Sequence, residues 1–304
     1  MINDCLVSVI IPTYKGDKFV CRAVESVLNQ NYSNLEVIVV DDNGQDTECQ
    51  VETYNVLSKF FEDDRFNYYK HQINKNGSAA RNTGFLHSNG KYIAYLDDDD
   101  WFVEDKISLQ VDFLEKNPEY GGVYGGRYEN GKKIIYKKQG DLSIDILLYK
   151  ILPCTCTLMI RREIIEQMNG WDEAYKRHQD FDFLLRFFQI SKIGVIKKPL
   201  FYIKKENSNN LTPIETIEKQ KRVYLNQFEP IINKVTNNKK RLKRKIYGVN
   251  YTRIICGYLR NKKKNDAKRV YKEAYEKCGF IIIFQILNYS FKYFLQKISR
   301  VFRK

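Results

Sequence analysis

The chain has 304 residues, of which 43% are hydrophobic and 14% aromatic, so it can bury a packed core and is not intrinsically disordered. The net charge of +14 is uneven: residues 213–304 hold 24 basic and six acidic residues, whereas residues 1–212 hold 27 basic and 31 acidic ones. This imbalance predicts two regions with different partners, one suited to a cation or a polyol and one suited to an anionic surface.

Strands and helices are predicted to alternate along the first hundred residues. Apolar runs predict strands at residues 6–13, 35–40, 66–70 and 92–96, and helical spacing predicts helices at residues 18–30, 47–61 and 79–88. This alternation is typical of βαβ units around a parallel sheet. Further strands are predicted at residues 120–124 and 155–160, a helix at residues 181–189, and basic helices without strands from residue 213 onward.

The seven cysteines are scattered and odd in number, and no secretory signal is recognisable near the first residue. We therefore expect a reduced, cytoplasmic setting. Cys154 and Cys156 form the one close pair. Their spacing predicts alternating faces of a strand rather than a metal site, because no partner ligands are evident.

Four consecutive aspartates, Asp97–Asp100, directly follow a predicted buried strand. Their carboxylates repel one another unless a cation or hydrogen-bond donors balance them. A divalent ion such as Mg²⁺ prefers oxygen ligands and shares them between one or two carboxylates and substrate phosphates. A helix N-cap or a solvated acidic turn is the alternative interpretation.

Two other segments are expected at the same edge of the sheet, beyond the carboxyl ends of the strands. Asp41 and Asp42 end a neighbouring strand and could accept the ring N–H of a pyrimidine or a ribose hydroxyl, or form an Asx turn with Asn43. Arg81, near a predicted helix start, suits a diphosphate together with backbone N–H groups. Neither a dinucleotide fingerprint nor a phosphate-loop motif is present.

Four ordered blocks of the sequence resemble family 2 glycosyltransferases of the GT-A fold. The blocks are Ser8–Thr47, NGSAARNTGF, GKYIAYLDDDDW and Asn169–Arg186, and the resemblance spans roughly residues 5–205. It implies an α/β fold with a mainly parallel sheet flanked by helices. Together with the charge imbalance, it leads us to expect a catalytic domain over residues 1–212 and a basic helical region over residues 213–304.

The activity that the resemblance implies is a metal-dependent, inverting transfer of a sugar from a nucleotide diphosphate sugar, with UDP as the expected nucleotide. The acceptor is expected to be a glycan or a lipid-linked glycan of a cell-surface polysaccharide. One carboxylate would take the proton of the acceptor hydroxyl, and Mn²⁺ or Mg²⁺ would stabilise the departing diphosphate.

The resemblance also implies roles for individual residues. The residues expected to bind the nucleotide are Pro12, Thr13, Tyr14, Asp42, Arg81, Asp97 and Asp98. Asp99 is expected to be the main metal ligand and Asp180 the catalytic base, while Trp171 and Asp172 are expected to line the acceptor site.

Asp180 is preferred to Asp182 as the base, because Asp182 has Arg186 four residues further on, at the spacing of a helix ion pair. A helix N-cap is the alternative role of Asp180, and His178 could orient it.

Two departures from the family pattern affect the site. Residues 201–205 read FYIKK where relatives often have a histidine, so Lys204 or Lys205 is expected to make the anionic contact instead. Gln179 stands where glutamate is common.

The last residues predict an amphipathic helix. Its apolar stripe comprises Phe280, Ile283, Phe284, Leu287, Phe291, Phe294, Leu295, Ile298, Val301 and Phe302. A polar side excludes a bilayer-spanning helix, so we expect peripheral contact with an anionic surface, the inner face of the cell membrane, helped by basic clusters at residues 239–245 and 262–264. A helix packed on the catalytic domain is the alternative.

Two other functions fit part of the pattern. A sugar-nucleotide nucleotidyltransferase could share the sheet, but such enzymes usually carry a glycine-rich loop with basic residues after the first strand, where this chain has Pro12, Thr13 and Tyr14. A nucleic-acid-binding protein would explain the basic tail. The acidic first region and the lack of a recognisable RNA or DNA module argue against nucleic acid as a partner.

Overall fold

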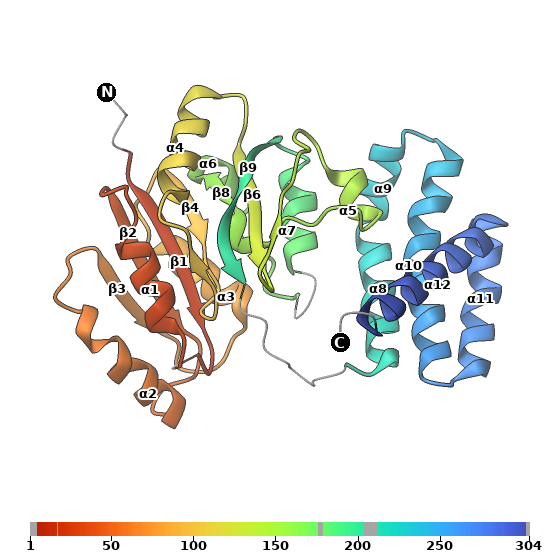
Figure 1. The fold of residues 1–304 in the computed structure, drawn as a ribbon, viewed down its shortest axis with the longest axis horizontal. Helices are drawn as coiled ribbons and strands as arrows, with labels where there is room; N and C mark the ends of the chain where they lie inside the picture. Colours follow the sequence, from red (N-terminus) through yellow and green to blue (C-terminus); the bar gives the residue numbers. More distant parts are fainter. Residues whose placement is uncertain (1–4, 17, 176–178, 204–211, 302–304) are drawn as a thin grey trace. The chain divides into compact units, whose positions relative to one another are not determined.

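The computed structural model describes residues 5–16, 18–175, 179–203 and 212–301, with side-chain burial as far as residue 291 (Figure 1). The chain forms two compact units. The first, called here the sheet unit, comprises Met1–Leu142 and Leu152–Asn207. The second, called the helical unit, comprises Ser143–Ile151 and Ser208–Lys304.

The first half of the sheet unit confirms the predicted alternation of strands and helices. The strands β1 (Val7–Thr13), β2 (Leu35–Asp41), β3 (Phe66–Lys70) and β4 (Tyr92–Tyr95) are parallel. The helices are α1 (Val20–Leu28), α2 (Glu48–Leu57) and α3 (Gly77–Leu86). The last residue of β1, Thr13, pairs with the last residue of β2, Asp41, so both strands end at the same level.

Continuous apolar strands are covered on both faces, as their pattern predicts. On one face, Val9 and Val37 belong to the main core, which also includes side chains of α1. On the other face, Ile38 and Val40 pack with Ala80 of α3. The sheet therefore holds β1 and β2 rigidly, and with them the residues that follow each strand.

The second half of the sheet unit is mixed. Its strands are β5 (Trp101–Phe102), β6 (Gly122–Glu129), β7 (Lys132–Ile134), β8 (Met159–Arg161) and β9 (Ile193–Ile203). The order across the sheet is β3-β2-β1-β4-β8-β6-β9-β5, with β7 beside β6. Strand β8 is antiparallel to β4 and β6, whereas β6 and β9 are parallel.

The described residues of this unit also form the helices α4 (Lys106–Lys116), α6 (Arg162–Gln167) and α7 (Gln179–Phe187). The predicted α/β fold, with a mainly parallel sheet flanked by helices, is confirmed.

The predicted strand at residues 155–160 is wrong in its first half. Thr155–Thr157 form a 3-10 turn, η2, and β8 begins only at Met159. Cys154 and Cys156 therefore do not alternate across a strand. The pattern failed because a short buried turn and a buried strand have the same apolar composition.

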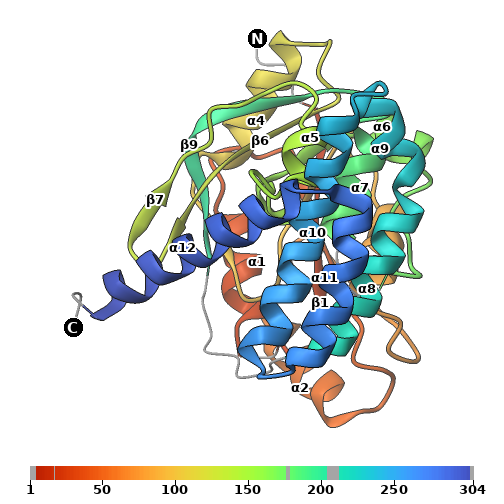
Figure 2. The ribbon, with the colours of Figure 1, turned by 90° about the vertical axis from the view of Figure 1, so that its right-hand side faces the viewer.

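The helical unit confirms the prediction of basic helices. It contains α5 (Ser143–Leu147), α8 (Ile214–Gln227), α9 (Glu229–Thr236), α10 (Lys240–Arg260), α11 (Lys264–Cys278) and α12 (Ile281–Val301). Helices α10 and α11 lie side by side, and α12 contacts both (Figure 2). Within the described part of the chain, no helix is both long and apolar enough to cross a bilayer.

Candidate active site

The polar segments that follow β1, β2 and β4 meet at one edge of the sheet. These strands are parallel neighbours in the order β2-β1-β4, so their carboxyl ends point the same way. The predicted residues of Pro12–Tyr14, Asp42 and Asp97–Asp99 all lie at this edge. Helix α7 and the turn η2 contribute the side chains of Asp180 and Thr155 to the same region.

Asp98 fixes the segment that follows β1. Its Oδ2 atom accepts a hydrogen bond from Thr13 Oγ1 at 2.6 Å and another from the backbone N–H of Tyr14 at 3.3 Å. Burial raises the pKa of Asp98 to about 6; the hydrogen bond from Thr13 opposes this shift, and the neighbouring carboxylates add to it. The side chain of Tyr14 is 51% exposed and is thus accessible to a ligand.

The backbone must come close to this pair. A Cβ atom on Gly16 would lie 1.9 Å from Asp98 Oδ2 and 2.5 Å from Thr13 Oγ1. Only glycine leaves room there for the hydrogen bond between Thr13 and Asp98.

The carboxylate of Asp42 is buried among donors of the protein itself. Oδ1 lies 2.7 Å from His71 Nδ1 and accepts the backbone N–H of Lys75 at 2.7 Å. Oδ2 accepts from Asn74 Nδ2 at 2.9 Å and from the backbone N–H of Asn76 at 2.8 Å. Asp42 thus organises the loop that leads into α3, and its expected contact with a base stays a prediction.

The Asx turn considered for this segment is formed by Asp41 and not by Asp42. Asp41 Oδ1 accepts the backbone N–H of Asn43 at 2.8 Å, and Asp41 Oδ2 accepts the hydroxyl of Tyr68 at 2.7 Å. Asp41 is fully buried. It therefore serves the turn after β2 and is not exposed to a ligand.

Arg81 lies in the second turn of α3 and is 7% exposed. Its guanidinium donates to Asp97 Oδ1 at 2.8 Å and to Gln179 Oε1 at 3.2 Å. At the start of α3, the side chain of Asn76 already accepts two backbone N–H groups. These groups were expected to bind a diphosphate, but they are engaged within the protein. Arg81 instead ties α3 to the acidic turn and to α7, and its contact with a nucleotide stays a prediction.

Asp180 is brought close to the strand-end carboxylates. Its Oδ1 atom accepts a short hydrogen bond from the hydroxyl of Thr155 in η2. Burial raises the pKa of Asp180; the charge of Arg81 and the Thr155 hydrogen bond oppose this, and Asp97 raises it further. Arg81 and Asp97 are therefore near enough to act on Asp180. Because Asp180 lies inside the first turn of α7, it does not precede the helix as an N-cap would.

The alternative carboxylate in α7 has another task. Asp182 is buried and pairs with Arg186 at 2.6 Å, which confirms the helix ion pair predicted from their spacing. His178, Lys204 and Lys205, to which the sequence assigned supporting roles, lie outside the described residues.

A group that could hold a metal ion lies beside Arg81. The carboxylates of Asp97 and Asp100 and the sulfur of Cys156 offer ligand atoms within 4.8 Å of one another. Carboxylate oxygens suit Mn²⁺ or Mg²⁺. The thiol does not, because burial raises the pKa of Cys156 well above its ordinary value and its Sγ donates to Asp100 at 3.4 Å. Asp97 and Asp100 are thus the two members of this group that fit the ion.

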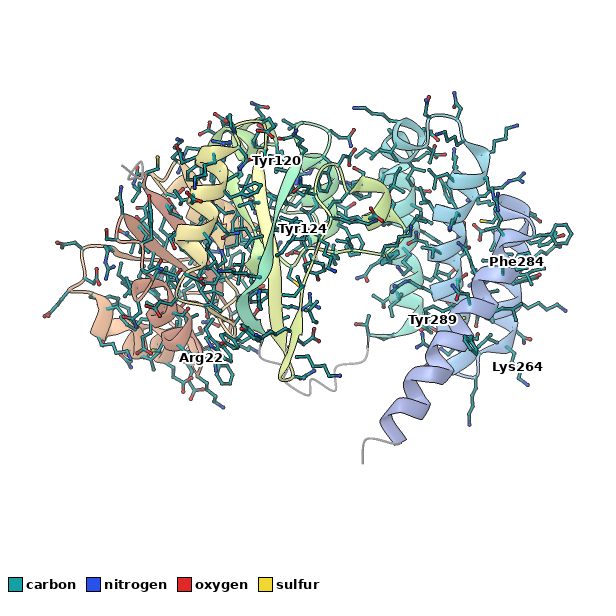
Figure 3. The ribbon with its side chains drawn as sticks, turned by 45° about the horizontal axis from the view of Figure 1, so that its top comes forward. Arg22, Tyr120, Tyr124, Lys264, Phe284 and Tyr289 are labelled. Atoms are coloured by element: carbon teal, nitrogen blue, oxygen red, sulfur yellow. The ribbon has the colours of Figure 1, made fainter. Side chains whose placement is uncertain are left out.

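Asp99, the predicted main metal ligand, is not a member of that group, and its role stays a prediction. Its backbone oxygen accepts a hydrogen bond from Arg22 at 2.6 Å. The Arg22 guanidinium lies 3.8 Å above the ring of Trp101 (Figure 3 labels Arg22). Arg22 therefore fixes the backbone of the acidic turn.

Trp171 and Asp172 lie at different depths. Trp171 is 3% exposed and stacks on Phe183, with ring centroids 4.0 Å apart. Asp172 is partly exposed and accepts the backbone N–H of Ala174 at 2.9 Å. The ring of Trp171 thus supports the site from the core, and acceptor binding by these two residues stays a prediction.

Sequence reasoning missed four residues of this region: Arg22, Asp100, Thr155 and Cys156. Asp100 carried a signal, because it belongs to the aspartate run. Cys156 was noticed as one of a close pair of cysteines but was not expected at this site. Arg22 and Thr155 are brought to the edge by α1 and η2, and nothing in their local sequence marks them.

The family model described as Glycosyl transferase family 2 matches residues 8–171. An uncharacterized glycosyltransferase of Rickettsia bellii is 42% identical over 117 residues, which cover 38% of this chain and 16% of that protein. The Escherichia coli protein named UDP-Glc:alpha-D-GlcNAc-diphosphoundecaprenol beta-1,3-glucosyltransferase WfgD is 31% identical over 148 residues, covering 45% of this chain and 56% of that protein. The chain thus spans less than two thirds of the length of either relative.

Among solved structures, S. aureus TarS 1-349 in complex with UDP-GlcNAc has a TM-score of 0.61 at 17% identity, covering 91% of this chain and 90% of that one. The mannosyltransferase PcManGT from Pyrobaculum calidifontis, in complex with GDP-Man and Mn²⁺, has a TM-score of 0.53 at 13% identity, covering 90% and 69%. These likenesses concern the fold, which is of the GT-A type. Because the family model covers more than half of the sequence, including the blocks at Ser8–Thr47 and around Asp97, the chain belongs to glycosyl transferase family 2.

Proposed function

We propose that the protein transfers a sugar from a nucleotide diphosphate sugar to an acceptor hydroxyl, with inversion at the anomeric carbon. The observation that carries this proposal is the approach of three groups from distant parts of the sequence: Asp97 after β4, Arg81 in α3 and Asp180 in α7. A carboxylate able to act as a base then lies near carboxylates able to hold a cation.

The chemistry assigned to Asp180 is proton removal. As the acceptor oxygen bonds to the anomeric carbon, its proton passes to the Asp180 carboxylate, and the bond between that carbon and the donor diphosphate breaks. A single displacement of this kind inverts the anomeric centre. Burial raises the pKa of Asp180, which brings the carboxylate closer to the basicity that proton transfer near neutral pH requires.

The same region suits a divalent ion. Asp97 and Asp100 would hold Mn²⁺ or Mg²⁺, and Asp99 remains a proposed ligand. The ion would neutralise charge on the leaving diphosphate. Support comes from PcManGT, whose structure contains GDP-Man and Mn²⁺.

The nucleotide is proposed to lie against the segment after β1. Tyr14 is exposed there, while Thr13 and Asp98 hold its backbone in place. A UDP-sugar is the proposed donor, as in the complex of TarS with UDP-GlcNAc. The proposed acceptor is a glycan carried on a lipid diphosphate during cell-surface polysaccharide synthesis, since the name of the E. coli relative specifies such an acceptor.

A panel of nucleotide sugars tests the proposal. The purified chain is incubated with UDP-, GDP- and TDP-sugars, with Mn²⁺ or with a chelator, and the release of nucleoside diphosphate is measured. We expect turnover of a UDP-sugar that chelation abolishes and added Mn²⁺ restores. Turnover that persists in the chelator would contradict a role for the metal. Conversion of the UDP-sugar and added pyrophosphate to UTP and a sugar 1-phosphate would favour a nucleotidyltransferase.

The helical unit is proposed to contact an anionic membrane surface through α12. The exposed fractions of Phe280, Phe284, Leu287 and Phe291 are 69%, 71%, 62% and 61%. The opposite side of α12 packs on its own unit, where Ile282 is buried. An exposed aromatic stripe on a basic unit is typical of helices that lie in a membrane interface.

The double substitution Phe284→Ser with Phe291→Ser tests this contact. We expect vesicle flotation of the full chain to weaken by roughly tenfold or more, because each phenylalanine loses its apolar burial. The matched control, Asn288→Ala with Ser290→Ala, changes exposed polar residues of the same helix and should leave flotation unchanged. Equal flotation of both variants would remove α12 from membrane contact.

A further inference from the structure

The helical unit contains a basic pocket of about 330 Å³, a volume at the lower end of the range typical of small-molecule sites. Its lining residues come from α8, α9, α10 and α11: Asn226, Glu229, Lys240, Lys243, Arg244, Tyr247 and Lys277. Four of them are cationic and one is acidic. The pocket therefore carries a formal excess of positive charge. None of its residues takes part in the proposed sugar transfer.

The cations of the pocket are only partly neutralised. Lys243 Nζ lies 3.3 Å from the carboxylate of Glu229 and 2.6 Å from Asn233 Oδ1. Glu229, the single acidic residue of the lining, is therefore already paired with one of the cations. Lys277 is 3.6 Å from a carboxylate outside the pocket. Lys240 and Arg244 are exposed, and no carboxylate of the described residues lies within ion-pair distance of either of them.

Three cations of the pocket lie where a helix tolerates positive charge least. Lys240, Lys243 and Arg244 all lie in the first five residues of α10, where the helix dipole is positive and cations are unfavourable. The N-cap residue, Lys239, makes no side-chain capping bond. An anion in the pocket would offset both the mutual repulsion of the cations and their conflict with the helix dipole.

An exposed apolar face begins beside the pocket. Lys277 lines the pocket, and Phe280, three residues further on, is 69% exposed. Gln285 Nε2 donates to the backbone oxygen of Lys245 at 2.8 Å, which ties α12 to the segment of α10 that carries the pocket cations. Phe284, on the same stretch of α12, projects from the helical unit and is exposed (Figure 3).

Building on the membrane contact proposed for α12, we propose that this pocket binds the phosphate or diphosphate group of a membrane lipid, with the adjoining aromatic face of α12 against the hydrocarbon chains. Lysine and arginine side chains are the usual ligands of phosphate oxygens, and basic pockets next to apolar surface bind lipid head groups. A free phosphate has the same polar chemistry but makes no use of the apolar face.

The test compares two double variants of the full chain that remove the same charge. Lys240→Gln with Arg244→Gln empties the pocket of its unpaired cations, and Lys268→Gln with Lys272→Gln, exposed on α11, is the matched control. Sedimentation is measured with neutral phosphatidylcholine vesicles and with vesicles that also contain phosphatidic acid. We expect the pocket variant to bind the anionic vesicles roughly tenfold or more weakly, and the control to change by less than about threefold.

Circular dichroism melting confirms that both variants fold, and the single variant Arg244→Gln replaces the double one if it does not. Equal losses in both double variants would reduce the effect to overall charge and overturn the proposal, as would no loss in the pocket variant. Titration with inorganic pyrophosphate without divalent ions separates the sources. Pyrophosphate binding without vesicle binding would overturn the lipid assignment, and so would tighter binding to single-stranded RNA that the pocket variant loses.

Discussion

The surroundings of Asp42 and Asp180 differ, although both are aspartates of the sheet unit that family resemblance links to the donor and acceptor. Protein donors surround both oxygens of Asp42: the ring of His71, the side chain of Asn74 and two backbone N–H groups. Asp180 accepts a hydrogen bond from the hydroxyl of Thr155, which lies in the turn η2.

The difference teaches how to separate carboxylates that build the site from those available to react. A buried carboxylate whose two oxygens already accept four hydrogen bonds from the protein has little capacity left to accept one from a substrate. Burial instead raises the pKa of Asp180, which brings this carboxylate closer to the basicity that proton transfer near neutral pH requires. On this ground we expect Asp42 to position the loop before α3 and Asp180 to be the carboxylate that takes the acceptor proton.

The largest expected effect is that of Asp180→Asn. The transfer rate should fall about 10²- to 10⁴-fold, because no carboxylate remains to take the acceptor proton, while the affinity for UDP stays within about twofold. Product formation and nucleotide titration measure the two quantities. Asp182→Asn is the control: it breaks the pair with Arg186 and should lower thermal stability without a comparable loss in the rate per folded molecule.

The pH dependence sharpens the same assignment. A base must be ionised to accept a proton, so the transfer rate should rise as pH increases through the raised pKa of Asp180. That limb should be absent from the residual activity of Asp180→Asn. An unchanged rate in this variant would exclude Asp180 from the mechanism.

A smaller effect on activity, and a larger one on stability, is expected for Asp42→Asn. The NH₂ group of the new amide would face groups that themselves donate hydrogen bonds to Asp42 in the native protein. Together with the loss of charge-assisted hydrogen bonds, this should lower the free energy of unfolding by roughly 3 kcal/mol. Thermal melting measures the loss. The preference for UDP over GDP should persist in the folded protein. A variant of normal stability that no longer prefers UDP would make Asp42 a reader of the base and end the contrast with Asp180.

The smallest expected effect is a gain in stability for Asp98→Asn. Burial raises the pKa of Asp98 to about 6, so between about pH 4 and 6 the folded state binds more protons than the unfolded state. The contribution of this residue to stability is therefore present at acidic pH and lost as pH rises through about 6. The asparagine, which can still accept from Thr13, should be more stable than the native protein at pH 7.5 by roughly 1–3 kcal/mol and equal to it near pH 4.

Melting temperatures of the two proteins across this pH range, measured without divalent ions, test the expectation. A constant difference in melting temperature at every pH would show that the pKa of Asp98 is the same in the folded and unfolded states. Added Mn²⁺ provides a further comparison, since a bound cation near Asp97 and Asp100 would favour the charged form of their neighbour.

The sequence by itself determined the sheet and the edge at which the site lies. Continuous apolar strands such as β1 and β2 can be satisfied only when both faces are covered, and the strands must end where Thr13, Asp41 and the aspartate run begin. The four-residue spacing of Asp182 and Arg186 likewise fixed their pairing, because the geometry of a single helix turn decides it.

Only the tertiary structure decided which of these carboxylates accept hydrogen bonds from the protein itself. The donors to Asp42 come from a loop about thirty residues further along, and Thr155 reaches Asp180 from a turn that the apolar pattern presented as a strand. Hydrogen bonds between segments far apart in sequence depend on how the loops are placed by the packed core. No local sequence pattern encodes these hydrogen bonds. For this reason the sequence could not show that Arg81 and Asp42, both expected to contact the nucleotide, also form hydrogen bonds within the protein.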